Sequence, residues 1–122
     1  LRTYEPRTLR EGYTHLRQGK TLGFVLDQYA GPPVGIRVPF FGVPVGTPAV
    51  VAVLAKRSGA AVVPVVNYRT PDGRHRVRIE APLPWISDEN PDREIALNTA
   101  AYAAKIESHV REVPDQWLWV HR

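Results

Sequence analysis

The sequence contains no cysteine among its 122 residues. This absence excludes disulfide frameworks, zinc sites built on thiolates and cysteine nucleophiles. Methionine is absent as well, and the first residue is Leu1. Because translation begins with methionine, the chain is a processed product or an excerpt, and we expect an excerpt from a longer protein. A domain of this length can still bury roughly two-thirds of its unfolded surface, so a packed core needs no disulfide or metal.

Long hydrophobic runs are also missing. The longest apolar stretch, residues 43–55, is interrupted by proline and glycine. It is too short to cross a bilayer, which takes about 20 residues. The sequence shows no secretory signal pattern. Any membrane contact made by these residues is therefore expected to be peripheral.

The charge is biased toward the basic side. Sixteen lysines and arginines stand against twelve acidic residues, which gives a formal net charge of +4. Such a surface suits anionic partners such as phosphates, nucleic acid or an anionic membrane. A basic surface that binds nothing has the same charge, so charge alone selects no partner.

The order of apolar and turn-forming segments predicts one α/β domain over residues 1–122. An apolar run directly after the first helix is typical of a strand covered on both faces. With the second helix and the next apolar run, it predicts a right-handed parallel βαβ core. An antiparallel hairpin and a carboxyl-terminal helix complete the fold. The expected elements are a helix over 6–18, strands over 21–26 and 60–68, a helix over 47–58, a hairpin strand over 74–80 and a helix from Asn90 to Val113.

Three signals mark the ends of these elements. Gly59 is placed to close the second helix, and Pro114 to end the last one. The segment 70–73, "TPDG", is typical of a type I turn between hairpin strands.

Between the first strand and the second helix, residues 28–46 are rich in glycine and proline. We interpret them as a long irregular loop, which in a compact domain is usually functional.

Gly19-Lys20-Thr21 resembles the end of a phosphate-binding P-loop. That motif requires another glycine five positions before Gly19, where this sequence has Thr14. It also requires the loop to lead from a strand into a helix, whereas here it leads from a helix into a strand. We therefore interpret Gly19 as a helix-to-strand turn and reject nucleotide hydrolysis on this motif.

His75 and Glu80 have the spacing of a general-base dyad. On a strand, however, residues an odd number apart face opposite sides, and five residues span roughly 16 Å. We therefore predict no dyad here. The histidines outside this segment have no ligand-like spacing, and no serine lies in a nucleophile elbow. We expect no metal site.

Asp27 and Gln28 lie at the carboxyl end of the first predicted strand, where parallel sheets bind ligands. An alternative is that Asp27 only caps the loop through backbone amides. Phe40 and Phe41 lie in the same loop and are suited to contact an acyl chain, although core anchoring is equally common for such residues.

Five segments taken together resemble a known family. They are "LRQGKTLGFVLDQYAG", "VPFFGVPVGT", "LAKRSGAAVVPVV", "PDGRHRVRIE" and "VPDQWLWVHR". In this order they are similar to the carboxyl-terminal part of the late acyltransferases of lipid A biosynthesis, the bacterial lauroyl and myristoyl transferases. The resemblance covers nearly the whole chain. It implies part of the glycerolipid acyltransferase fold.

The resemblance implies transfer of a fatty acyl group from acyl carrier protein to a hydroxyl of a phosphorylated glucosamine lipid, with no cofactor. It implies a His-x-x-x-x-Asp/Glu dyad and a membrane helix upstream of these residues, so the chain itself has no catalytic residue and is expected to be inactive alone. The expected substrate-binding residues are Asp27, Gln28, Arg37, Phe40, Phe41 and Gly42. Pro64 and Trp119 are expected to be structural.

The implied partners are acyl carrier protein, a lipid A precursor and the inner membrane surface on its cytoplasmic face. The basic charge would then meet lipid phosphates and an acidic carrier protein. Arg10, Arg17 and Arg37 are the candidates for these contacts. No nucleic acid is expected.

Three alternatives remain open. One is a related acyltransferase that acts on another glycolipid, such as the mannoside type of actinobacteria. Another is a non-enzymatic module that binds nucleic acid through Arg74, Arg76 and Arg78, although this hairpin lacks the interleaved aromatics that stack on bases. The last is a pseudo-enzyme or regulatory piece.

Overall fold

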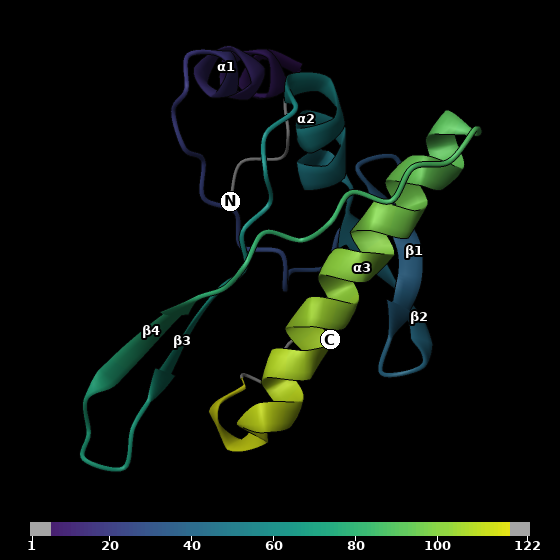
Figure 1. The fold of residues 1–122 in the computed structure, drawn as a ribbon. Helices are drawn as coiled ribbons and strands as arrows, with labels where there is room; N and C mark the ends of the chain where they lie inside the picture. Colours follow the sequence, from purple (N-terminus) through teal and green to yellow (C-terminus); the bar gives the residue numbers. More distant parts are fainter. Residues whose placement is uncertain (1–5, 118–122) are drawn as a thin grey trace.

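The computed structural model describes residues 6–117, so the predicted structural role of Trp119 lies outside the described residues. Two short helices lie at one end, a long helix runs diagonally across the molecule, and one hairpin extends away from the helical end (Figure 1). In chain order the elements are α1 (Pro6–Arg17), β1 (Gly35–Phe40), β2 (Val43–Pro48), α2 (Val50–Ser58), β3 (Val65–Arg69), β4 (His75–Ile79), α3 (Pro91–Glu112) and the 3-10 turn η1 (Pro114–Gln116).

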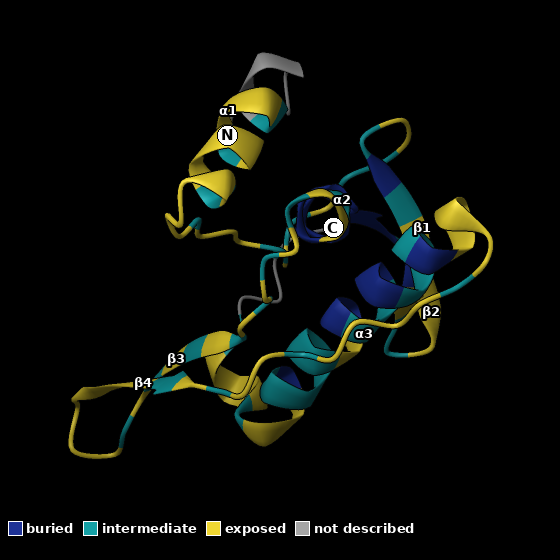
Figure 2. Ribbon diagram, turned by 45° about the horizontal axis from the view of Figure 1, so that its top comes forward, coloured by how far each residue is buried: buried dark blue, intermediate teal, exposed yellow. Residues whose placement is uncertain are grey.

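The hydrophobic core is centred on α2. Val50, Val51, Ala52 and Leu54 are buried there together with Tyr102 of α3. Figure 2 shows the buried residues concentrated on α2, α3 and β1, whereas α1 and the tip of the β3–β4 hairpin are mostly exposed. Each large apolar side chain buried in this way contributes roughly 1.5–3 kcal/mol. The core therefore holds α2 against α1 and α3.

Helix α2 ends as predicted but begins later than predicted. Gly59 follows its last turn with φ of 73°, a left-handed conformation that glycine adopts without strain. Thr47 and Pro48 do not start the helix. They pair with Ile36 and Gly35 in the β1–β2 ladder instead. Thr47 and Pro48, which the local pattern assigned to the start of the helix, are therefore part of strand β2.

Helix α3 confirms the predicted carboxyl-terminal helix at both ends. The side chain of Asn90 accepts hydrogen bonds from the backbone N–H groups of Asp92 and Arg93, and Pro114 follows the last turn. About two helical turns after Asn90, the fully buried Asn98 accepts from the N–H of Ile86 at 3.0 Å and donates to its carbonyl at 2.8 Å. Asn98 therefore fixes the link between β4 and α3 against the helix.

The β3–β4 hairpin is also confirmed. Its strands pair antiparallel from Val65 opposite Ile79 to Arg69 opposite His75. The turn is closed by a hydrogen bond from the N–H of Thr70 to the carbonyl of Arg74, with Gly73 at φ of 82°. A proline–aspartate–glycine turn has the conformation this connection needs.

The predicted parallel βαβ core is not present in the described residues. Both sheets there are two-stranded and antiparallel, one formed by β1 and β2 and the other by β3 and β4. The predicted strand over 21–26 is extended but unpaired, and the region 60–64 forms only an isolated bridge between Val62 and Leu83. A strand exists only where a neighbour supplies hydrogen-bond partners, and no described residue does so for 21–26.

The predicted irregular loop over 28–46 is also wrong in its second half, which forms the β1–β2 hairpin. Phe41 and Gly42 connect the strands with φ of 49° and 78°. Two left-handed residues are what a two-residue type I′ turn requires. Pro39 and Pro44 lie opposite each other one pair away from this turn, where N–H groups point away from the partner strand, so neither proline costs a ladder bond.

Candidate functional site

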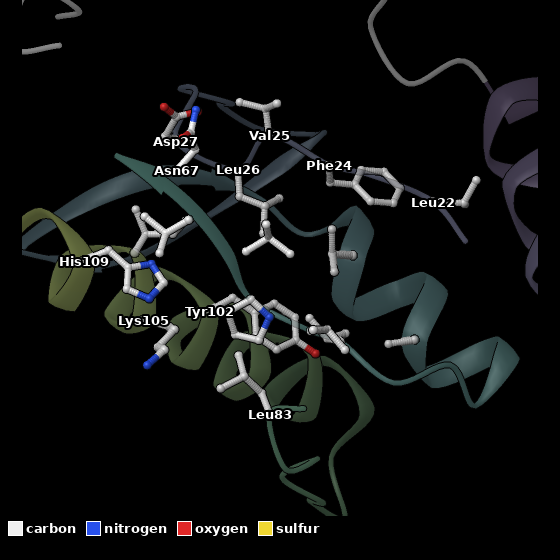
Figure 3. A pocket seen from close by; sticks show the side chains of 18 of the residues that line it. Leu22, Phe24, Val25, Leu26, Asp27, Asn67, Leu83, Tyr102, Lys105 and His109 are labelled. Carbon is white, nitrogen blue, oxygen red and sulfur yellow. The ribbon is translucent and has the colours of Figure 1, made fainter. Parts of the chain in front are cut away.

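A groove lies between the extended segment 22–27, the segment 60–67 and helix α3 (Figure 3). It encloses about 580 Å³, within the range of ligand sites in proteins. Its body is apolar and its polar groups lie toward one end, away from Leu22 and Phe24. The apolar wall includes Leu22, Leu26, Val62, Leu83, Tyr102 and Ile106, and the polar lining includes Asp27, Asn67, Lys105 and His109.

Asp27 lines this groove at its polar end. Its side chain is exposed and makes no hydrogen bond or ion pair with the described residues. The alternative that Asp27 caps the following loop therefore finds no support in the described part of the chain. Gln28 follows it in a bend and is half-buried.

The turn formed by Phe40, Phe41 and Gly42 is held by α3. The backbone N–H of Phe41 donates to a carboxylate oxygen of Glu107 at 2.7 Å. The other oxygen of Glu107 accepts from Arg111 at 2.9 and 2.6 Å. Arg111 in turn lies 4.6 Å from the centre of the Phe41 ring. The Phe41 N–H, and after it Arg111, lowers the pKa of Glu107 below its ordinary value.

Trp117 connects this turn to the groove. The ring of Phe40 packs edge-on against Phe41 at 4.9 Å and lies 6.3 Å from the ring of Trp117, which also lines the groove. Arg37 lies further back on β1, exposed and opposite Gly46. The predicted substrate-binding residues therefore fall in two places. Asp27 lies in the groove, whereas Phe40, Phe41 and Gly42 form the β1–β2 turn that is bonded to α3.

A cluster of charges around Glu80 was not predicted. Its carboxylate accepts from His109 at 2.8 Å and from Arg78 at 3.1 Å, and it forms an ion pair with Lys105. Lys105, followed by His109, lowers the pKa of Glu80 to about 2. A second bond, from Arg78 to Glu112 at 2.8 Å, ties β4 to α3. The cluster fastens the β3–β4 hairpin to the helix beside the groove.

The prediction that His75 and Glu80 form no dyad is confirmed. Nδ1 of His75 lies 3.3 Å from the side-chain oxygen of Asn67, across the hairpin. Glu80 bonds to residues of α3 and to its neighbour Arg78 instead.

The sequence does carry part of the evidence for the missed contacts. Lys105 and His109 are four residues apart, as are Glu107 and Arg111, and such pairs share one face of a helix. The spacing does not reveal their partners Glu80 and Phe41, which lie 29 and 66 residues away in sequence.

Neither a metal site nor a membrane span is found in the described part of the chain. Among residues 6–117 no group of three histidine or acidic side chains is arranged to hold a metal ion. No helix within the same range is long and apolar enough to cross a membrane.

Comparison with known proteins identifies the family. Residues 3–122 match the family model described as bacterial lipid A biosynthesis acyltransferase. The chain belongs to this family. The acyltransferase family match covers nearly all of the chain, and it confirms the resemblance that the five sequence segments indicate.

Individual lipid A acyltransferases agree with this assignment. The chain is 33% identical over 109 residues to the lipid A biosynthesis lauroyltransferase of Escherichia coli K12. It is 34% identical over 111 residues to the lipid A biosynthesis palmitoleoyltransferase of the same strain, and 29% identical over 108 residues to a lipid A biosynthesis acyltransferase of Haemophilus influenzae. Each match covers 88% of this chain but only 32–34% of the relative. The chain thus spans about one third of the length of the curated relatives it matches.

Proposed function

We propose that this chain is the carboxyl-terminal third of an enzyme that transfers a fatty acyl group from acyl carrier protein to a hydroxyl of a phosphorylated glucosamine lipid. The observation that carries the proposal is the family match over residues 3–122. The two Escherichia coli relatives are named for a lauroyl and a palmitoleoyl group. Because the chain is about equally similar to both relatives, the comparison does not indicate which acyl chain length this protein transfers.

Asp27 is the proposed substrate-orienting residue. Its exposed carboxylate has no structural partner among the described residues and lies at the polar end of the groove. A carboxylate in that position can accept a hydrogen bond from a sugar or acyl hydroxyl. Gln28 follows directly and adds a side-chain amide that both donates and accepts.

The Phe40–Phe41–Gly42 turn is the proposed contact for the acyl chain. Two aromatic rings packed edge-on offer a rigid apolar surface. The bond from Phe41 to Glu107 and the ring contact with Trp117 support this surface from α3 and its carboxyl end. Arg37, exposed on the same hairpin, is proposed to meet a phosphate of the acceptor.

The general base is proposed to come from polypeptide outside these 122 residues, as a His-x-x-x-x-Asp/Glu dyad. Such a histidine removes the proton from the acceptor hydroxyl as that hydroxyl attacks the acyl carbonyl carbon. His75 does not supply it, because its ring contacts Asn67 in an exposed hairpin. Without the dyad, this third of the enzyme is expected to bind substrate but not to turn it over.

The proposed location is the cytoplasmic face of the inner membrane. Arg10 and Arg17 are exposed on α1, and they are proposed to meet anionic headgroups or the acidic carrier protein. No cofactor beyond the acyl carrier protein thioester is proposed, and no nucleic acid partner.

The test is an acyl-transfer assay on the whole enzyme with acyl carrier protein thioesters and a phosphorylated glucosamine lipid that bears a free hydroxyl. We expect transfer to this acceptor and none to a mannoside glycolipid. Transfer to the mannoside alone would mean that the acceptor is a mannoside glycolipid and not a phosphorylated glucosamine lipid. Absence of transfer, combined with DNA or RNA binding that weakens steeply with salt, would establish the nucleic-acid module instead.

A further inference from the structure

We infer that the unpaired segment 21–27 forms a sheet with a β-strand from polypeptide outside residues 1–122. The inference rests on the proposed function, because it takes the chain to be part of a longer enzyme. It identifies what covers the groove beside this segment.

Over nine consecutive residues, the backbone of this region has no hydrogen-bond partner in the described part of the chain. The last hydrogen bond before it runs from the N–H of Lys20 to the carbonyl of His15 at 3.0 Å. The next runs from Ala30 to the carbonyl of Gly46 at 2.9 Å. Between them, no backbone group of residues 21–29 bonds to any described residue. An extended chain with free N–H and C=O groups is a template for another strand.

The middle of the segment carries apolar side chains on both faces. Leu22 and Leu26 pack against the core around α2. Phe24 lines the groove, and Val25, which also lines it, is 66% exposed. An apolar sequence without alternation is typical of strands covered on both faces, and here only one face is covered.

The opposite wall of the groove is equally uncovered. Val63 and Val65 line it with 41% and 59% of their surface exposed. With Val25 they form an apolar surface on both sides of one groove. Exposed apolar surface of this kind marks an interaction site. A strand laid along 21–27 would satisfy the backbone N–H and C=O groups on one edge of the segment and cover these valines.

The remaining polypeptide is the occupant that the observations favour. The chain spans 34% of the length of its Escherichia coli relatives, so about two-thirds of each relative lies outside the matched region. A strand tethered in the same polypeptide acts at an effective concentration in the mM range. A second copy of the chain would have to reach the same edge from dilute solution.

The first experiment is hydrogen exchange on the unmodified longer enzyme. One partner strand bonds every second N–H of a strand, so we expect alternate amides of residues 21–27 to be protected from exchange to the same degree as those of α3. Exchange as fast as that of an unprotected peptide would overturn the inference. This measurement needs no substitution, so it cannot fail through misfolding.

The second experiment identifies the occupant. A photo-crosslinking amino acid is placed at Val25 of the longer enzyme, with a matched control at Glu89, which is exposed and has no partner among the described residues. We expect the Val25 probe to crosslink to the same polypeptide outside residues 1–122, and the control not to do so. A crosslinked dimer would assign the edge to a second copy, and a crosslinked lipid would assign the groove to acyl chains. Both outcomes overturn the inference.

An activity assay on the same preparation separates this inference from the proposed function. Active enzyme with unprotected amides at 21–27 would contradict the strand pairing and support the acyltransferase proposal. Inactive enzyme with a protected segment and an intramolecular crosslink would support the strand pairing and contradict the acyltransferase proposal.

Discussion

Glu107 of α3 accepts a hydrogen bond from the backbone N–H of Phe41, which lies 66 residues earlier in the sequence. This bond joins the tip of the β1–β2 hairpin to the carboxyl-terminal half of the longest helix. Phe41 has φ of 49°, which is uncommon for a bulky residue. The carboxylate therefore holds the turn in a conformation that its own sequence does not favour.

Replacing Glu107 is expected to weaken acyl transfer by misplacing the aromatic turn. Glu107→Ala removes both the acceptor for Phe41 and the partner of Arg111. We expect a loss of about 10- to 100-fold in kcat/KM, the order that displaced positioning groups cost. Glu107→Gln keeps an acceptor for Phe41 and is expected to recover most of the loss.

Steady-state kinetics on the longer enzyme checks this prediction, with KM for the acyl donor and kcat determined separately. Arg111→Ala is the comparison variant, because it removes the ion pair and the contact over the Phe41 ring but leaves the bond from the Phe41 N–H to Glu107. If Glu107→Ala matched wild type in KM and kcat, the turn would have no part in substrate binding.

Local signals predict the helices and one hairpin of this fold. Gly59, Asn90 and the turn at 70–73 each determine a backbone conformation through their own chemistry, and each lies where the sequence places it. The same reasoning does not predict the β1–β2 hairpin. Its proline and glycine content indicates a loop, whereas the outward-facing positions of Pro39 and Pro44 make a ladder possible.

The candidate site is harder to predict from the sequence, because it depends on contacts between segments that are distant in the chain. The prediction of Asp27 and the aromatic turn as site residues uses only their place in the chain, whereas the partners of Glu80 and Phe41 depend on how α3 crosses the two hairpins. The predicted strand over 21–26 shows the same dependence, because its sequence favours a strand while the strand itself requires a neighbour.

Asp27→Ala is expected to lower acyl transfer by more than tenfold while the fold stays intact. The carboxylate makes no bond to the described residues, so its loss removes no stabilising contact among them. The measurement is kcat/KM on the longer enzyme together with its thermal midpoint. Glu89→Ala, which removes another exposed and unpaired carboxylate, is expected to retain wild-type turnover. Wild-type turnover in Asp27→Ala would leave this residue without a role in substrate binding.

His75→Ala is expected to leave acyl transfer nearly unchanged. The ring is exposed, and its Nδ1 lies 3.3 Å from the side-chain oxygen of Asn67 on the neighbouring strand. It lies on a different face from Glu80, which bonds to α3. The assay is again kcat/KM, with circular dichroism to monitor folding. A folded but inactive variant would contradict the strand geometry and make His75 a candidate base.

Glu80→Gln is expected to destabilise the protein near neutral pH but not in strong acid. Lys105 and His109 lower the folded-state pKa of Glu80 from 4.5 to about 2. A depressed carboxyl pKa stabilises the folded state above the unfolded value, and this contribution is lost as the pH falls through the folded value. The difference between wild type and Glu80→Gln should therefore be constant above about pH 4.5, shrink below it and vanish near pH 2.

Urea unfolding of the longer enzyme at a series of pH values measures this difference, read as a change in midpoint at constant slope. Glu89→Gln is the matched control, because Glu89 is exposed and pairs with no described residue, and its midpoint should follow wild type throughout. A Glu80→Gln difference that persisted unchanged to pH 2 would mean that the residue stabilises the hairpin through packing. A difference absent at neutral pH would mean that Lys105 and His109 contribute nothing by pairing with it, and that Arg78 and Glu112 alone tie β4 to α3.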